Sequence, residues 1–477
     1  MKNSQDSPPE VSEEKLDKRR LARSTLCCTC LLITVEGMDV QLLPASFRAL
    51  EAGLGYSPTK LALLAVGQSI AVSFSGPAWA NLADSGCSRR ILLASGAALW
   101  ATFTFGLAWT WLYPAMMFLR LLNGCALGMV SPVIQAVVAE TSDEMDRGRS
   151  FGWITLFERI FGEVTGIVVV TAISNVIYHG IYGWRFAFMF VAVGSMVIAS
   201  IILLFMEEAP RPWKPENLGL SVELGKLRRC WRIPSFRIIV LQGMFGRIAW
   251  SGLGSFGPMY FQYVGVSDLS AGIICGMVIL GGGLGGLGGG IIADRLAQWS
   301  PNHGRPLAAQ LSVGLGILAL MLLLCIPRDP SMQVFMGMSS LLLGLVASWC
   351  ATGCNRPVML DIVPPDCWAS VLAWDVCLER GVGAFIGPLI TGLVSDKVFN
   401  YQTSMEQVAD MTFAQRSRNA DALGNSLLLC GVIPWLVTLS IYGLLHRTYA
   451  ADAALAQQER KAIEDGRQPY GTFAPLD

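Results

Sequence analysis

Charged residues and histidine are scarce in this chain. Charged residues make up 15% of its 477 residues, whereas soluble domains carry about 25%. Only three histidines are present, and the cysteines show no paired zinc-ligand spacing with them. We therefore expect no metal site, no cofactor and no enzyme activity. Basic and acidic residues are equal in number, 35 each, so net charge gives no argument for a nucleic-acid partner.

Hydrophobic residues form 53% of the chain and gather in long runs. A membrane-spanning helix needs about 20 mainly apolar residues. Twelve runs meet this requirement: 24–47, 59–83, 90–112, 114–139, 150–173, 185–206, 237–263, 269–293, 306–327, 331–360, 368–395 and 423–446. They predict an all-α integral membrane protein with two six-helix bundles, residues 24–206 and 237–446, joined by the polar loop 207–236.

Basic residues are distributed unevenly between the two sets of loops. With residues at the span edges such as Arg237 counted in the neighbouring loop, the N-terminal tail 1–23, the C-terminal tail 447–477 and the loops after even-numbered spans carry 23 Lys and Arg, against seven in the opposite loops. Because positive charge accumulates on the cytosolic side, we predict that both tails and the loop 207–236 are cytosolic. Residues 1–20 and about 455–477 are polar, so we expect them to be poorly ordered.

The two halves of the chain share a repeated segment. Residues 153–166 and 374–387 match at an offset of 221, through the pairs Trp153/Trp374, Glu158/Glu379, Arg159/Arg380, Gly162/Gly383 and Gly166/Gly387. The acids Glu140 and Asp361 share this offset, and Asp84 and Asp294 repeat at a similar one. Such a repeat within an apolar chain indicates a transporter made of two homologous halves around a central site.

A glycine-rich run lies in the eighth predicted span. Residues 281–290 read Gly-Gly-Gly-Leu-Gly-Gly-Leu-Gly-Gly-Gly. The run lacks the preceding strand and the Gly-Lys-Ser/Thr ending of a phosphate-binding loop. Small residues at this density inside an apolar span let helices approach closely, so we interpret the run as a packing surface.

A loop in the second half resembles a motif of a large transporter family. Residues 290–295 read Gly-Ile-Ile-Ala-Asp-Arg and are followed by Arg305. This pattern resembles the loop signature that joins the second helix to the third in the major facilitator superfamily. The first-half copy, residues 80–85, reads Ala-Asn-Leu-Ala-Asp-Ser before Arg89 and Arg90, so it lacks the glycine and the first arginine.

The fourth span adds to the resemblance. Arg120-Leu-Leu-Asn-Gly124 resembles the superfamily's fourth-helix pattern Arg-x-x-x-Gly, and Glu140 follows at the cytosolic end. Within the superfamily the Spinster-like branch is the nearest resemblance, because Asp39, Arg120 and Glu140 fall at its spacing. Leu127 stands where that branch usually places a glutamate. The resemblance implies the major facilitator fold, with twelve helices in two pseudo-symmetric bundles.

Several ionisable residues lie inside the predicted spans, where each costs about 2.5–3.5 kcal/mol to insert. Helices one and four line the cavity in the superfamily. The candidate substrate and proton-coupling residues are therefore Glu36, Asp39, Arg120, Arg247 and Arg356. A carboxylate that alternates between pairing with Arg120 and binding a proton would couple transport to a proton gradient. A fixed structural ion pair is the alternative.

The resemblance also implies a cytosolic gate whose ion pairs lock one conformation and break in the other. Its residues are Asp84, Arg89, Arg90, Glu140, Asp294, Arg295, Arg305 and Asp361. The alternative is a set of solvated loop charges, because exposed ion pairs contribute little. The repeated pairs Glu158-Arg159 and Glu379-Arg380 lie at equivalent depth, which favours a symmetric structural or gating role over contact with substrate.

These features predict a secondary active transporter of a small organic solute that works by alternating access. Arg120 favours an anionic or zwitterionic solute, because its planar fork suits carboxylate, phosphate or sulfate groups. Protons are the candidate coupling ion. We expect a monomer in the lipid bilayer of the plasma membrane or an endomembrane. The alternatives are a transporter-like solute sensor or receptor, or a lipid transporter or scramblase for substrates such as lysophospholipid or sphingolipid.

Overall fold

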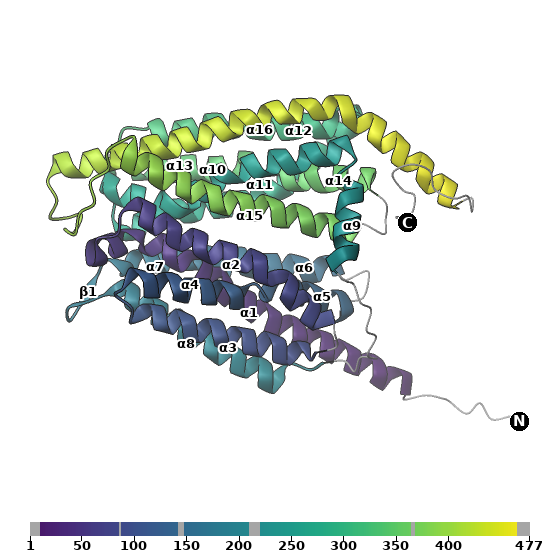
Figure 1. The fold of residues 1–477 in the computed structure, drawn as a ribbon, viewed down its shortest axis with the longest axis horizontal. Coiled ribbons are helices and arrows are strands. Elements are labelled where there is room, and N and C mark those ends of the chain that lie inside the picture. The colour runs from purple at the N-terminus through teal and green to yellow at the C-terminus, as the bar shows by residue number, and fades with distance from the viewer. Residues whose placement is uncertain (1–9, 85–86, 142–146, 209–219, 364–367, 465–477) are drawn as a thin grey trace, which may run out of the picture. The chain divides into compact units, whose positions relative to one another are not determined.

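Helices make up almost all of the structure (Figure 1). The computed structural model describes residues 10–84, 87–141, 147–208, 220–363 and 368–464 of the chain. Ten of the helices in these ranges are long and apolar enough to span a membrane. The two other predicted spans, 150–173 and 237–263, are also helical.

The first six predicted spans coincide with helical segments. In chain order these are α1 (Glu10–Leu54), α2 (Pro58–Asp84), α3 (Arg89–Ala108), α4 (Tyr113–Leu127), α5 (Val130–Thr141), α6 (Arg147–Leu156), the π-helix η1 (Phe157–Val164), α7 (Thr165–Ser174) and α8 (Gly183–Phe205). The fourth span is divided between α4 and α5, and the fifth runs through α6, η1 and α7.

The last six predicted spans are also helical. Their segments are α10 (Pro234–Val264), α11 (Asp268–Trp299), α12 (Gly304–Cys325), the 3₁₀ helix η2 (Pro330–Met332), α13 (Gln333–Ala347), the π-helix η3 (Cys350–Asn355), α14 (Arg356–Ile362), α15 (Trp368–Lys397) and α16 (Phe413–Glu464). Local sequence explains several boundaries. For example, α10 begins with a proline. Proline has no backbone N–H, and an N–H at this position would have no hydrogen-bond partner within the helix. The helix ends before Gly265, whose φ of 98° lies in the left-handed region that favours glycine.

Three regions predicted to be loop or poorly ordered contain regular structure. The loop 207–236 contains α9 (Leu220–Cys230), α1 begins at Glu10, and α16 continues to Glu464. The described parts of both tails are thus helical, because each extends a membrane helix, and their expected poor order stays a prediction. Between α7 and α8, the strands β1 (Ile177–Tyr178) and β2 (Ile181–Tyr182) form a short hairpin. Its two turn residues have positive φ, as such turns require.

The chain divides into two compact units that do not follow the two halves of the sequence. The first unit contains Met1–Asp39, Ala71–Glu163 and Phe188–Glu216. The second unit contains Val40–Ile70, Val164–Ala187 and Asn217–Asp477. Two segments of the first half, 40–70 and 164–187, thus belong to the same unit as the whole second half. The predicted bundle boundaries at 206 and 237 stay a prediction.

The glycine-rich run of α11 is a packing surface, as predicted. Gly281, Gly285 and Gly289 lie one turn apart and face α13 and Trp349, where an added Cβ would collide with backbone or ring atoms. By contrast, a Cβ at Gly286 would meet no atom within 4 Å. One stripe of the run therefore brings two helices into backbone contact, and the other glycines leave open space.

We predict opposite effects for two adjacent substitutions in this run. Gly285→Ala should destabilise the protein by about 1–3 kcal/mol, because the methyl group has no room. Gly286→Ala should be neutral or stabilise by up to about 1 kcal/mol, because alanine favours a helix over glycine. Thermal unfolding of the detergent-solubilised variants measures both. Equal effects at the two positions would contradict the packing interpretation.

Candidate functional site

A buried polar cluster lies inside the first unit, among α1, α3 and α4. The Asp39 side chain is 0% exposed. Its Oδ1 accepts a hydrogen bond of 2.9 Å from Thr104 Oγ1, and Thr104 Oγ1 accepts one of 2.8 Å from Asn123 Nδ2. Both partners are also fully buried. This chain of hydrogen bonds holds the carboxylate in one position within the apolar span.

Arg120 belongs to the same unit and is 1% exposed. None of its three guanidinium nitrogens has a hydrogen-bond partner among the described residues. Its charge is opposed by that of Asp39, and its guanidinium carbon lies 5.9 Å from the centre of the Phe188 ring. A buried guanidinium with unused donors is costly. Within the described residues, the buried charge of Arg120 is thus opposed by a carboxylate but makes no hydrogen bond.

Glu36 lies in a different environment, at the contact between α1 and η1. Here two backbones approach closely, since a Cβ on Gly37 would come within 2.7 Å of the Glu158 carbonyl oxygen. In η1, Arg159 Nη1 donates to Glu163 Oε2 at 3.0 Å. The charges of Glu158 and Glu36 also act on Arg159. The structure thus associates Glu36 with Arg159 and Asp39 with Arg120, although the two acids are neighbours on one helix.

The second half carries a corresponding polar cluster around α15, within the second unit. Glu379 Oε1 accepts a hydrogen bond of 3.5 Å from Asn355, and Asn355 Oδ1 accepts one of 2.7 Å from Tyr442. One oxygen of the buried Asp375 has no hydrogen-bond partner among the described residues. The nearby charge of Arg356 acts on Asp375.

The two copies of the repeated segment differ in backbone and in partners. The Glu158-Arg159 pair lies in a π-helix, whereas Glu379 lies in the regular α15. Glu379 packs on Gly243 of α10, and Arg247, one turn further, packs on Gly383. The side chain of Arg380 lies outside the described residues. The two copies therefore match in sequence position and differ in local backbone structure, and the predicted symmetric role of the two pairs stays a prediction.

Three predicted gate residues of the second half, Asp294, Arg305 and Asp361, make polar contacts near the ends of their helices. Arg305 forms an ion pair of 3.1 Å with Asp294 and donates to the Gly353 carbonyl at 3.1 Å. Asp361 accepts from Tyr449 at 2.7 Å. Arg295 is exposed. Tyr449 was not predicted as a site residue, because it lies just beyond the last predicted span, in α16, with no motif to mark it.

Part of the predicted first-half gate is also visible. Arg89 is buried, and its backbone N–H donates to Glu208 Oε1 at 2.8 Å. Arg90 Nη1 lies 3.5 Å from the Met206 carbonyl oxygen. Glu208 thereby caps the start of α3, a role that no motif in the sequence indicates. The side chains of Asp84 and Glu140 lie outside the described residues.

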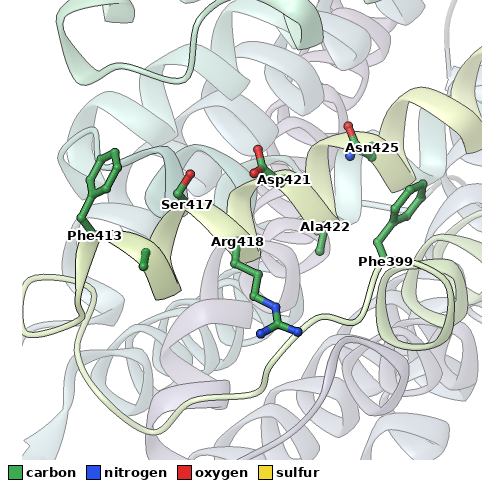
Figure 2. Close-up of a pocket in the computed structure, with 8 residues that line it drawn as sticks. Phe399, Phe413, Ser417, Arg418, Asp421, Ala422 and Asn425 are labelled. Carbon is green, nitrogen blue, oxygen red and sulfur yellow. The ribbon is translucent and has the colours of Figure 1, made fainter.

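A surface pocket of about 410 Å³ lies at the start of α16 and contains none of the predicted site residues. Its lining includes Phe399 and Phe413, with Arg418, Asp421 and Asn425 between them (Figure 2). Asp421 and Asn425 are already paired with Arg328. We assign this pocket no role in transport.

Comparison with known proteins agrees with this architecture. The profile of the Major Facilitator Superfamily matches residues 29–388. A bacterial homolog of the human lysosomal transporter Spinster, in an inward-facing and unoccupied conformation, superposes with a TM-score of 0.77 at 18% identity over 91% of this chain and 98% of its own. A D-xylose–proton symporter superposes with a TM-score of 0.63 at 16% identity, over 87% and 96%. These identities support a likeness of fold alone.

Curated relatives match a shorter segment. Synaptic vesicle glycoprotein 2B of Rattus norvegicus is 24% identical over 216 residues, which cover 43% of this chain and 29% of that protein. The match therefore spans less than a third of that relative. The family profile, by contrast, covers most of this chain. The chain belongs to the major facilitator superfamily and is a multi-pass integral membrane protein.

Proposed function

We propose that this protein is a secondary active transporter of a small organic solute with an anionic or zwitterionic group, coupled to protons. The observation that carries the proposal is the buried Arg120, with unused donors and Asp39 as its opposing charge. Membership of the superfamily supports a transport function, and one relative of similar fold is described as a proton symporter.

The chemistry of Arg120 favours an anionic group in the solute. Its guanidinium presents a planar set of N–H donors that matches a carboxylate or phosphate in two parallel hydrogen bonds. None of these donors is used by the described residues. An anion that reached Arg120 would thus satisfy buried donors without displacing existing hydrogen bonds, which is a favourable exchange.

Asp39 is the group that we propose to carry the proton. While ionised, it opposes the charge of Arg120 and accepts from Thr104. On protonation, the attraction between the two side chains would be lost, and Arg120 would become available to the anion. Proton binding and solute binding would then favour each other, as a symport mechanism requires.

A solute sensor without net flux remains the competing function. Both proteins would bind solute, so binding alone does not separate them. Uptake by purified protein in proteoliposomes does, because a coupled transporter accumulates solute above its external concentration and a sensor does not. A lipid transporter or scramblase would instead move a fluorescent lipid between the leaflets of the same vesicles.

We predict that Arg120→Lys lowers the initial uptake rate by about tenfold or more. Lysine keeps the positive charge but loses the planar fork, so two-point recognition of the anion is lost. Uptake of a solute that stabilises the wild-type protein is the measurement. Arg418→Lys, the same change at an exposed arginine, should transport normally. Normal uptake by Arg120→Lys would contradict the anchor role.

Another prediction concerns proton coupling. Asp39→Asn should remove the pH dependence of uptake and prevent accumulation, because the asparagine side chain cannot bind and release the proton. Exchange of internal for external solute should persist. Proteoliposomes with and without an imposed proton gradient separate the two modes, and Asp410→Asn, an exposed loop position, is the matched control. Gradient-driven accumulation by Asp39→Asn would assign coupling to another group.

A separate prediction addresses the cytosolic gate. Asp294→Asn should lower the transport rate at least about fivefold, the scale of a modest coupling energy. Its side chain is 62% exposed, so folding stability should change by less than about 1 kcal/mol. Uptake, thermal unfolding and solute binding are compared in one preparation. Lost binding with a proportional loss of transport would indicate a binding role instead.

A further inference from the structure

Glu51, at the end of α1 beyond the predicted span, is the centre of a buried polar cluster within the second unit. Its side chain is 0% exposed. The carboxylate accepts from Tyr263 at 2.7 Å, from Tyr401 at 2.8 and 2.7 Å, and from the backbone N–H of Ser404 at 3.1 Å. One acidic side chain thus joins α1, α10 and the loop between α15 and α16.

Arg48 completes this cluster, one turn earlier on α1. Its Nη1 lies 3.5 Å from Glu51 Oε2, and its guanidinium donates to the carbonyls of Ser404 and Glu406. The guanidinium carbon also lies 5.1 Å from the centre of the Tyr263 ring. Burial raises the pKa of the Tyr401 phenol well above its usual range, and the neighbouring Glu51 charge adds to this. Tyr401 therefore remains a hydrogen-bond donor.

Two other acids make comparable contacts between elements of the two sequence halves. Asp396 of α15 accepts from the backbone N–H of Thr59 at 3.0 Å, at the start of α2. Asp268 of α11 accepts from Asn175, at the end of α7, at 2.9 Å. The helices behind these contacts pack tightly, since a Cβ on Gly392 would lie 2.9 Å from the Pro58 carbonyl oxygen.

These contacts all lie near helix ends on the same predicted side of the membrane. They involve the end of α1, the start of α2 and the end of α7, which the charge distribution predicts to be exterior. They also explain why segments 40–70 and 164–187 group with the second half. Glu51 differs from the other two acids because it is fully buried and has an arginine within its cluster.

We propose that the Glu51 cluster is the latch that holds the exterior end of the transport pathway closed, with Glu51 as its positioning residue. This inference rests on the proposed transport function, because alternating access requires first-half and second-half elements to separate on that side once per cycle. A buried ionic cluster suits a latch, since removal of one partner leaves the others buried without compensation. Loss of Glu51 should therefore favour the open exterior.

The test measures the separation directly, without any solute. In a background without native cysteines, Ile177→Cys and Gln402→Cys carry spin labels at two exposed positions, one on β1 and one on the loop. Distance distributions are recorded in proteoliposomes for the latch variants Glu51→Gln and Tyr401→Phe. Glu406→Gln is the matched control, because it makes the same chemical change at an exposed side chain. Only the backbone carbonyl of Glu406 contacts Arg48.

We expect Glu51→Gln to increase, by about tenfold or more, the population with a long distance between the two spin labels relative to the population with a short one. Tyr401→Phe should shift it in the same direction, and Glu406→Gln should leave it unchanged. Unchanged distances in folded Glu51→Gln, or an equal shift in Glu406→Gln, would overturn the latch. If Glu51→Gln does not fold, Tyr401→Phe decides by the same criterion. A shift in a protein that moves no solute would support the latch and reject the proposed transport function.

Discussion

The cost of placing charge in an apolar environment is the constraint on which this structure depends. Each ionisable residue in a membrane span costs about 2.5–3.5 kcal/mol, so each needs a partner or a function. Asp39 has Thr104 and the charge of Arg120, and Glu51 has two tyrosines and Arg48. Arg120 has the opposing charge but no hydrogen bonds among the described residues. That difference separates a structural cluster from a candidate binding group.

Close backbone contacts determine which charges meet. Small residues allow α1 to touch η1 at Gly37. The charge of Glu36 therefore acts on Arg159, and the charge of Asp39 acts on Arg120. The same device brings α15 against α2 at Gly392, beside the contact of Asp396 with Thr59. A transporter must break some of these contacts in each cycle. In the proposed mechanism, the contacts that break are those of the ionic clusters, because protons or solute can weaken the attraction within them. The apolar packing holds each helix pair together throughout the cycle.

The sequence predicted the helices well because length and hydropathy are local properties. It also predicted that Glu36 or Asp39 lies near Arg120, and the charge of Asp39 acts on Arg120 in the structure, while the role of both residues stays a prediction. It did not predict that Glu36 associates with Arg159, because a π-helix changes which residues of the fifth span face α1. Glu51 was missed for another reason. It lies beyond the end of its predicted span, and its partners Tyr401 and Ser404 come from an irregular loop 350 residues away, where no periodicity indicates contact.

A thermal-shift comparison tests the central claim, that Arg120 is the anchor for an anionic group. Wild-type protein and Arg120→Gln are heated with matched panels of anionic, zwitterionic, cationic and neutral solutes, since a ligand of the folded state raises apparent stability. We expect that stabilising solutes are anionic or zwitterionic and that the stabilisation is lost in Arg120→Gln. Stabilisation by cationic or neutral solutes alone, or by anions equally in both proteins, would contradict it.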